Sequence, residues 1–459
     1  MAESPDRKEL SERAAELARQ LVAKRFPPGS EGPRTLAEME EALAHVKREL
    51  GEQLQRLWIQ QQEQDTENRT ECATCLGAAR FCGDRERLVV TRHGEFGFER
   101  RYYYCPVCRE GFAPLDRGLG LDRQATTVQV RAWLADLGSD GAFEMAARRL
   151  ATFTDVRLSE STAARTTVEV GGRLREEELR EAEQILRGEA VPRRTPWQPQ
   201  RLYLSLDGSM TPLRDPWKQD GSLGALHCRY GECKTAVCFE TRRDKQGRPV
   251  AARRQYTATL EPVEQFEKLV VGLAYHCGSD QAAEKVVLAD GLAYNWRIAA
   301  EYFPEALQIL DLYHVLEHLH TLAGLCLEGS QEADGEAGVT PAEWVAAQKE
   351  RLLADGVRAV VEAIEALPAP SKEAAECREE TRGYVARNAE RMRYGTFVAA
   401  GYQIGSGVME AACKSVAHQR LDQAGMHWRT ETADAVVALR ANQLSHSPRD
   451  LRTYCVGWS

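Results

Sequence analysis

The chain has 459 residues, of which 43% are hydrophobic and 28% are charged, and its formal net charge is -9. This length exceeds one ordinary domain, so several packed cores are expected. The mild acidity argues against a small basic protein that coats DNA, but local basic patches would still allow DNA binding. No stretch approaches about 18 uninterrupted apolar residues and the N-terminus lacks a secretory pattern, so we expect a cytoplasmic protein that has no membrane contact.

Cysteine usage points to a metal site. The 13 cysteines, an odd number, include two CxxC pairs, with the remainder scattered along the chain. This pattern suits reduced thiols and one metal site better than a framework of disulfides.

Residues 1–68 are expected to form an N-terminal helical region. Helices are predicted over Leu10–Phe26 and Leu36–Gln62, and Thr35 with Glu38 makes a capping box for the second. That helix carries an apolar seam with alternating three- and four-residue steps, formed by Leu36, Met39, Leu43, Val46 and Leu50. The heptad spacing is interrupted after Leu50, so we expect either a short dimerising helix or a helix that docks on the next domain. We expect a homodimer.

Residues 69–118 contain the strongest local signal. Two CxxC knuckles flank a segment that alternates like a β-hairpin with a turn at His93–Gly94, and their ligands are Cys72, Cys75, Cys105 and Cys108. Four thiolates suit tetrahedral, structural Zn²⁺, so we predict a zinc ribbon. Cys82 could replace one of these ligands, and four unligated core cysteines are the alternative. Such modules bind DNA, RNA or protein, so the ribbon alone does not define a function.

Residues 119–172 are expected to form a helix-turn-helix DNA-binding domain of three short helices. Ser159 is the predicted N-cap of the third, and the segment TDVRL before it resembles the connecting turn. Recognition helices contact bases from their first turns, so the candidate residues are Ser161, Thr162 and Arg165. A small helical packing unit with no DNA contact is the alternative. Residues 173–200 are predicted to be a linker helix followed by a proline- and arginine-rich segment.

Residues 201–325 change to alternating patterns typical of strands. We predict three antiparallel strands, with a tight turn at Tyr230–Glu232, then a helix, a strand, a helix and a strand. This is the order of a ribonuclease-H-like α/β domain. In that order Asp207 ends the first strand and Asp290 ends the fourth, and these two strands are neighbours.

The remaining chain is predicted to interrupt and then complete this domain. Residues 326–398 are expected to be a helical insertion, 399–446 the C-terminal helices of the catalytic domain, and 447–459 a tail. Ser406 lies between two glycines and is the expected N-cap of a helix that carries Glu410 in about its second turn. The chain is therefore predicted to be a multidomain α+β protein.

Three acids from two strand ends and one helix suggest a two-metal site. Taken singly, Asp207 and Asp290 could be turn residues and Glu410 a solvated side chain. Together they could hold two Mg²⁺ or Mn²⁺ ions for cleavage of a DNA phosphodiester, with Asp207 between the ions. Three anions close together should also raise the carboxyl pKa values in the metal-free protein.

These residues carry a resemblance to a known family. The three acids, with the strings DGLAYNW, ILDLYHVLEHL, GSGVMEAACK and QRLDQAGMHW, resemble bacterial insertion-sequence transposases of the DDE class, ISKra-type. The resemblance extends from the zinc ribbon to Leu444. It implies binding of terminal inverted repeats, metal-dependent strand cleavage and strand transfer, with transposon ends and target double-stranded DNA as partners. Asp311 and His314 match a D-x-x-H element that would help to shape the site.

Some features leave room for other interpretations. Lys414, Arg420 and Arg429 could hold DNA phosphates or simply be solvated. The segment TPLRDPWKQDGSLGALH differs from the lysine-rich strand that the family leads us to expect after the first acid. One alternative function is a domesticated, noncatalytic, sequence-specific DNA-binding protein. Another, prompted by the string SLDGS, is a metal-dependent phosphohydrolase that acts on small molecules.

Overall fold

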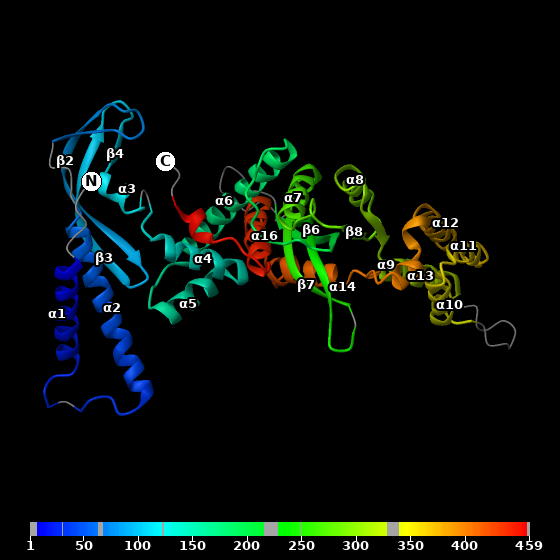
Figure 1. Cartoon of the computed structure of the whole chain (residues 1–459), viewed down its shortest axis with the longest axis horizontal. Coiled ribbons are helices and arrows are strands. Elements are labelled where there is room, and N and C mark those ends of the chain that lie inside the picture. The colour runs from blue at the N-terminus through cyan, green and yellow to red at the C-terminus, as the bar shows by residue number, and fades with distance from the viewer. Residues whose placement is uncertain are drawn as a thin grey trace. The chain divides into compact units, whose positions relative to one another are not determined.

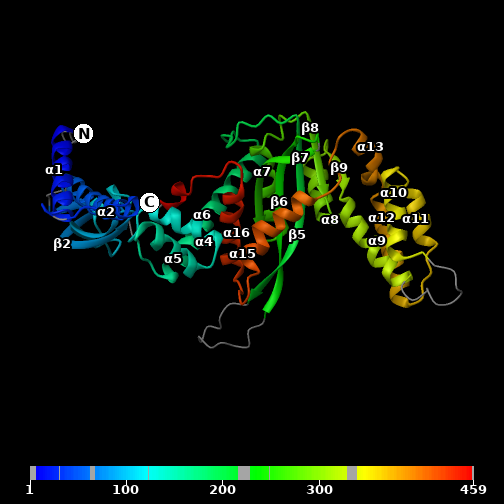
Figure 2. The ribbon, with the colours of Figure 1, turned by 90° about the horizontal axis from the view of Figure 1, so that it is seen from below.

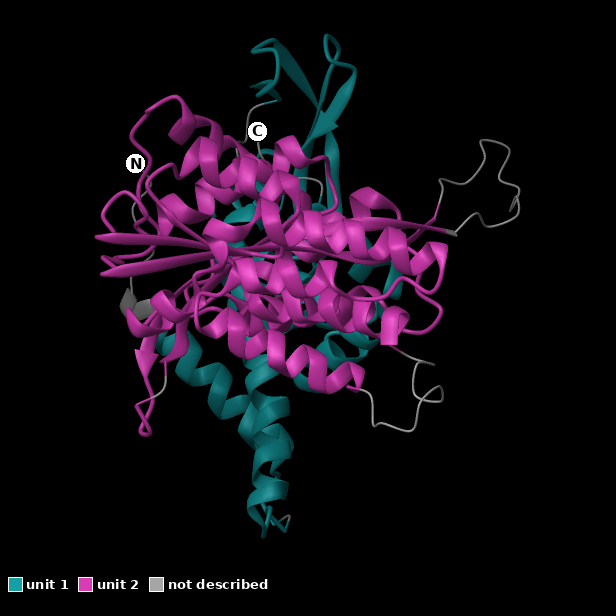
Figure 3. Ribbon diagram, turned by 90° about the vertical axis from the view of Figure 1, so that its right-hand side faces the viewer, with its two compact units in different colours: residues 1–170, 450–459 teal, residues 171–449 magenta. Residues whose placement is uncertain are grey.

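The computed structural model describes residues 7–29, 31–62, 68–121, 124–214, 228–247, 249–327 and 339–456. The chain divides into two compact units, coloured separately in Figure 3. Unit 1 comprises Met1–Val170 with Asp450–Ser459, and unit 2 comprises Gly171–Arg449. Within the described ranges, none of the helices is both long enough and apolar enough to cross a membrane.

Unit 1 begins with a pair of helices, α1 (Arg7–Arg25) and α2 (Leu36–Gln60), which pack against each other (Figure 1). The predicted capping box is confirmed: the Thr35 hydroxyl accepts a hydrogen bond from the Glu38 amide, and the Glu38 carboxylate accepts one from the Thr35 amide. The apolar seam of α2 is only partly covered. Val46 is buried, whereas Leu43 remains 60% exposed.

A four-stranded antiparallel sheet follows in unit 1. Its strands occur in chain order: β1 (Arg69–Glu71), β2 (Ala78–Thr91), β3 (Gly94–Cys105) and β4 (Glu110–Phe112). Thr91 pairs with Gly94, so the hairpin turns at residues 92–93, one position before the predicted turn. Gly94 adopts a φ of 117°, a left-handed conformation that favours glycine after the turn. A short helix, α3 (Pro114–Gly118), comes next.

Two helices and the first part of a third, which continues into unit 2 after Val170, follow in unit 1. Helices α4 (Val128–Asp140) and α5 (Phe143–Thr154) pack together and enclose a small core with Ala163 from α6 (Glu160–Leu186). Ser159 caps α6 as predicted, because its hydroxyl accepts a hydrogen bond from the Thr162 amide. A short 3-10 helix, Leu451–Cys455, also belongs to this unit.

Helix α6 differs from the sequence prediction, which separated a short third helix from a charged linker helix. The structure has one continuous helix of 27 residues. The helix continues through Gly171 and Gly172. Gly171 lies against the backbone of α16 (Thr430–Leu444), because a Cβ on Gly171 would overlap the backbone carbonyl of Ala435. The glycine therefore allows a close helix approach within unit 2 and does not mark a helix end.

The centre of unit 2 is a five-stranded mixed sheet in the order β7-β6-β5-β8-β9. The strands are β5 (Arg201–Arg214), β6 (Cys228–Arg243), β7 (Pro249–Thr259), β8 (Glu284–Ala289) and β9 (Leu307–Leu310). The first three are antiparallel, and β8 and β9 run parallel to β5. This sheet resembles a ribonuclease-H-like core, so the predicted strand order is confirmed.

One predicted turn in this sheet is wrong. Tyr230–Glu232 was expected to separate two strands, but β6 continues through it and Gly231 pairs with Thr211 of β5. The reason is again close packing, because a Cβ on Gly231 would overlap the Leu213 side chain. Most of the segment that departs from the family pattern, residues 215–227, lies outside the described residues.

Helices lie on both faces of the sheet in Figure 3. The crossover helices are α7 (Val263–His276) and α8 (Ala293–Tyr302), and α9 (Leu312–Leu327) follows the last strand. Buried apolar residues from the strands and these helices form one large core, including Leu206, Val287, Ile309 and Phe266. This core fixes the middle of β5, where Asp207 lies, and the end of β8, which Asp290 follows.

The predicted helical segment after α9 is present (Figure 2). Its helices are α10 (Pro341–Leu353), α11 (Val357–Glu365), α12 (Lys372–Arg387) and α13 (Tyr394–Ala399). Helices α10 and α12 pack on α9. Helix α12 ends at Arg387, and a 3-10 helix, Ala389–Met392, follows it. The acidic sequence EGSQEADGEAG occupies residues 328–338, which lie outside the described residues.

The chain then returns to the sheet. Helix α14 (Gly407–Cys413) packs against β5 and β6, a π-helical turn (Lys414–His418) and α15 (Gln419–Leu421) continue it, and α16 (Thr430–Leu444) packs against β7. Thus the helical insertion is followed in sequence by a helix that rejoins the sheet.

Candidate functional site

The four predicted cysteine ligands of unit 1 come together. The Sγ atoms of Cys72, Cys75, Cys105 and Cys108 all lie within 4.8 Å of one another, in the connections between β1 and β2 and between β3 and β4. The backbone amides of Cys75 and Thr74 lower the pKa of Cys72 to about 6, which favours the thiolate that metals bind. Four clustered sulfur donors fit a closed structural zinc site. Cys82 is exposed and does not belong to the cluster.

The helix-turn-helix candidates lie in the first turns of α6. Ser161 and Arg165 are exposed, while Thr162 is half-buried. The Ser159 hydroxyl lies 2.9 Å from the hydroxyls of both Ser161 and Thr162. Ser161 and Arg165 are four residues apart on one helix, so their side chains share a face.

In unit 2, Asp207 occupies a half-buried position on β5, paired with Thr235 of β6. Its Oδ1 atom accepts a hydrogen bond from the Gly208 amide at 2.7 Å, and the thiol of Cys413 donates to its Oδ2 atom at 3.7 Å. Burial and the nearby Asp290 carboxylate raise the pKa of Asp207 to about 6, while the proximity of His314 acts in the opposite direction. The expected rise in pKa is therefore present at this acid.

Asp290 directly follows β8, whose last residue Ala289 pairs with Leu206 of β5. Asp207 and Asp290 are therefore the next residues after the last paired positions of β5 and β8. Asp207 does not end its strand as predicted, because β5 continues to Arg214 and pairs there with β6. The Oδ1 atom of Asp290 accepts hydrogen bonds from the Leu292 amide at 3.1 Å and from the Asn295 amide group at 2.9 Å. These contacts fix the direction of the carboxylate.

The backbone around Asp290 is also held. Tyr384 of α12 donates its hydroxyl hydrogen to the Asp290 carbonyl at 2.7 Å. Gly291 adopts a φ of 101°, a conformation that other residues rarely take. A glycine is thus required immediately after this acid.

Glu410 is exposed on α14. Cys413, which contacts Asp207, is three residues later on the same helix, and so the two side chains share a face. The structure therefore brings the helix of Glu410 beside the strand of Asp207. It does not draw the three carboxylates into one tight group: across the described ranges, the four cysteines are the only set of three or more metal-ligand side chains within 4.8 Å of one another.

The D-x-x-H residues lie at the start of α9. Asp311 is buried and accepts hydrogen bonds from the amide and hydroxyl of Ser406. Ser406 occupies the N-cap position of α14, but its side chain does not cap the helix as predicted because it is bonded to Asp311. His314 is half-buried, with its Nδ1 atom 3.5 Å from Glu317.

The basic residues after Glu410 occupy different environments. Lys414 and Arg429 are exposed. Arg420 is buried, and its guanidinium lies 4.7 Å from the centre of the Trp428 ring. In this position Arg420 contributes to packing, and it does not present its charge at the surface.

Sequence reasoning missed a fourth carboxylate beside Asp207. A Cβ on Gly208 would overlap the Glu232 carboxylate, so that carboxylate lies directly against Gly208. Glu232 also accepts a hydrogen bond from the Tyr294 hydroxyl at 2.9 Å. The signal that could have found Glu232 is the alternation that continues through Gly231, which was interpreted as a turn.

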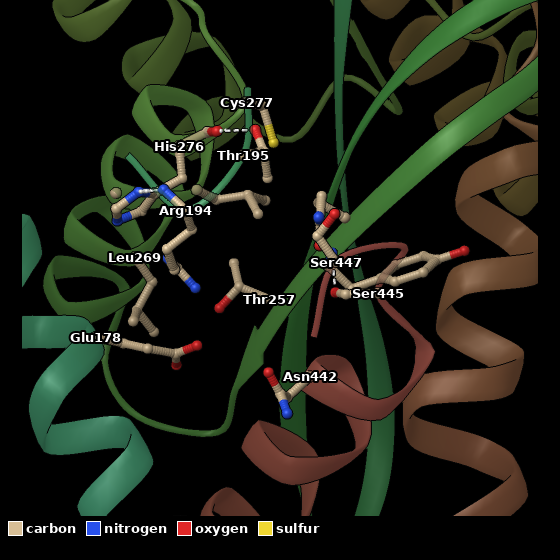
Figure 4. Close-up of a pocket in the computed structure, with 14 residues that line it drawn as sticks. Glu178, Arg194, Thr195, Thr257, Leu269, His276, Cys277, Asn442, Ser445 and Ser447 are labelled. Atoms are coloured by element: carbon tan, nitrogen blue, oxygen red, sulfur yellow. Dashed lines mark hydrogen bonds between the residues drawn. The ribbon is translucent and has the colours of Figure 1, made fainter. Parts of the chain in front are cut away.

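An enclosed pocket lies elsewhere in unit 2, among α6, α7, β7 and α16 (Figure 4). Its lining includes Glu178, Arg194, Thr257, His276 and Asn442, and its cavity volume is about 20 Å³. That volume holds about one water molecule. The pocket contains none of the predicted acids, and its size and polarity suit a buried water better than a substrate.

Comparison with known proteins finds structural similarity only at a distant level. No protein-family model matches the chain, and no curated protein matches it. Among solved structures, the chain is similar to one in the Drosophila P element transposase strand transfer complex, with a TM-score of 0.23 and 8% identity, over 69% of this chain and 78% of that chain. A similarity at this level carries no argument about function.

Proposed function

We propose that the chain is a DDE-type DNA transposase of an insertion sequence, of the ISKra type, which binds terminal inverted repeats and catalyses DNA strand cleavage and strand transfer. The observation that carries the proposal is the placement of the acids on a ribonuclease-H-like sheet. Asp207 lies on β5, Asp290 follows the neighbouring parallel strand β8, and α14, which carries Glu410, packs against β5.

The acid site has the donor chemistry that hard divalent cations require. Asp207, Asp290 and Glu410 would hold two Mg²⁺ or Mn²⁺ ions, which when bound activate the attacking oxygen and neutralise charge on the phosphate. Other residues of the chain influence the protonation and the orientation of these ligands. Burial and Asp290 keep Asp207 partly protonated near pH 6, so its proton must leave when a cation binds. Asn295 holds Asp290 by a hydrogen bond to its carboxylate.

Other regions supply DNA contacts in this proposal. The exposed residues Ser161 and Arg165 of α6, with Thr162, would contact the inverted repeats, and the zinc ribbon would stabilise the DNA-binding region. The exposed residues Lys414 and Arg429 would hold phosphates near the acids. The exposed apolar residues of α2, including Leu43, would join two copies into a homodimer.

The decisive experiment uses the purified full chain with Mn²⁺ and labelled DNA that carries both ends of its encoding element. We expect cleavage at the ends and joining of the freed 3′ hydroxyl to target DNA. Asp207→Ala should reduce cleavage by more than about 100-fold, because removal of an outer contact to a metal ligand already costs about 10–100-fold. Asp244→Asn, in the hairpin turn between β6 and β7, is a matched control that should leave cleavage unchanged. Full activity of Asp207→Ala would refute the proposal.

The exposed position of Glu410, outside any tight carboxylate group, favours the noncatalytic DNA-binding protein as the rival. That rival predicts specific binding of the ends without cleavage under Mg²⁺ or Mn²⁺. It also predicts that Asp207→Ala leaves the measured affinity for the ends unchanged and that no activity is lost.

A further inference from the structure

The loop that leads into α14 is held by hydrogen bonds to a buried carboxylate. Asp311 follows β9 and is 5% exposed. Its Oδ1 atom accepts hydrogen bonds from the backbone amides of Ser406 and Tyr313, both at 3.1 Å, and its Oδ2 atom accepts one from the Ser406 hydroxyl. Both carboxylate oxygens are thus engaged by donors from the protein, which leaves Asp311 suited to holding the loop and poorly suited to binding a cation.

Ser406, which is hydrogen-bonded to Asp311, lies at the start of the helix that carries Glu410. The Ser406 carbonyl accepts hydrogen bonds from the amides of Met409 and Glu410, at 2.6 and 2.9 Å. Asp311 therefore contacts the residue whose carbonyl closes the first turn of α14. Because α14 has only seven residues, the position of its first turn sets the position of Glu410.

Two neighbouring contacts further restrict the position of this loop. The Leu312 amide donates to the Ile404 carbonyl at 2.9 Å, so the chain is held on the other side of the loop as well. A Cβ on Gly405 would lie 2.6 Å from the Tyr313 ring, closer than real Cβ contacts allow. The glycine before Ser406 therefore permits the approach to α9, and the segment from Ile404 to Ser406 fits this one place.

We propose that Asp311 is a positioning residue, which holds Ser406 and thereby places Glu410 beside Asp207. The placement of α14 by Asp311 does not depend on the proposed function. Only the consequence of this placement for cation binding rests on that function. Asp311 acts through Ser406 and does not itself touch cation or DNA.

Asp355 provides a matched control. Its carboxylate accepts hydrogen bonds from the Gly395 amide and from the amide and hydroxyl of Thr396, at the start of α13. This is the same kind of contact in the same unit, on a helix that carries none of the three acids. Asp355→Asn should therefore disturb α13 and leave α14 unchanged.

The first test measures hydrogen exchange of the full chain without added metal. In Asp311→Asn we expect amides at residues 406–413 to exchange at least about 10-fold faster, since hydrogen bonds to a charged acceptor are lost. Amides of β5 and β8 should stay protected. The buried thiol of Cys413 should also react faster with an alkylating reagent. Wild-type protection of residues 406–413 in Asp311→Asn would overturn the proposal.

The second test separates positioning from general stability through Mn²⁺ affinity. Asp311→Asn should weaken Mn²⁺ binding by about 10–100-fold, the usual range for an outer contact to a metal ligand. In a Glu410→Gln background the same change should have little further effect, because Asp311 acts through Glu410. Ser406→Thr keeps a hydroxyl and should retain more Mn²⁺ affinity than Ser406→Ala. Equal effects of Asp311→Asn in both backgrounds would contradict the inference.

The two proposals fail differently. A wild-type chain that binds no Mn²⁺ would contradict the two-cation function. The exchange measurement would then still decide whether Asp311 positions α14.

Discussion

The four-cysteine cluster of unit 1 and the acid site of unit 2 are both suited to metal ions, but they are built in different ways. The cysteine sulfurs come from two short knuckles and already lie within 4.8 Å of one another. The acids come from the middle of β5, from the end of β8 and from a helix more than 100 residues further along the chain, and Glu410 remains exposed. A closed site of four protein ligands suits a structural ion, whereas an open site leaves room for substrate.

The charges differ as well. At the cysteines, backbone amides favour the charged form of Cys72. At the acid site, burial and a like charge oppose the charged form of Asp207. We therefore expect the sheet to hold Asp207 and Asp290 in place without cations, at an electrostatic cost that cation binding would remove, and we expect Zn²⁺ to stabilise the cysteine cluster by binding its thiolates.

The largest expected effect is the loss of a cysteine ligand. Cys105→Ser should abolish zinc binding and expose β1–β4 to hydrogen exchange, because structural zinc contributes about 10–16 kcal/mol of apparent binding free energy to folding. Zinc content and exchange of residues 69–112 are the measurements. Cys82→Ser, at an exposed cysteine outside the cluster, should behave as the wild type. Full protection in Cys105→Ser would show that this region, like the sheet, folds without its ion.

The next largest effect on stability is expected at Glu181, a carboxylate with a structural role. Burial raises the pKa of Glu181, but hydrogen bonds from His276 and Arg449 and the charge of Arg449 lower it to about 2. Glu181→Gln should reduce the free energy of unfolding at pH 7 by about 3 kcal/mol, the usual cost of breaking a buried ion pair.

The pH dependence of this effect follows from the lowered pKa. The contribution of Glu181 is present above about pH 4.5 and is lost as the pH falls towards about 2. Urea unfolding across this range would measure it. A difference between wild type and Glu181→Gln that did not shrink on acidification would rule out the ion-pair explanation.

The assembly of the acid site by the sheet can be tested at Gly231. Gly231→Ala should destabilise the protein by about 2 kcal/mol, as overpacking does, since the new Cβ would overlap Leu213. Gly407→Ala is the control, because a Cβ there meets no atom within 4 Å. Urea unfolding of both variants gives the comparison. Equal stabilities would mean that Gly231 is not needed for the close contact between β5 and β6.

The smallest expected effect has the opposite sign. In metal-free protein at pH 7, Asp207→Asn should increase the free energy of unfolding by about 1 kcal/mol after allowance for solvent screening, because it removes a disfavoured charge. The raised pKa also means that wild-type stability falls as the pH rises from about 3.8 to about 6. That fall should be absent in Asp207→Asn. Urea unfolding at pH 4 and pH 7 would detect both effects, and a destabilised variant would contradict the electrostatic account.

Much of the fold could be predicted from periodicity and caps. The strand patterns within residues 201–325 predicted the order of the strands, and Thr35 and Ser159 indicated the starts of two helices. The errors have a shared cause. The segment Tyr230–Glu232 was predicted to be a turn, and the third short helix was predicted to end before the linker helix, but Gly231 and Gly171 each permit a close approach to another segment. A sequence shows that a glycine is present but not which segment packs against it.

The sequence by itself determined the four-cysteine ligand set, the order of the strands and the identity of the three candidate acids, because these depend on spacing and on local periodicity. Only the tertiary structure decided that Glu232 lies against Gly208, that Arg420 is buried and that Ser406 bonds to Asp311 and does not cap its own helix. Each of these depends on contacts between segments far apart in the chain, where the partner and not the residue type sets the role.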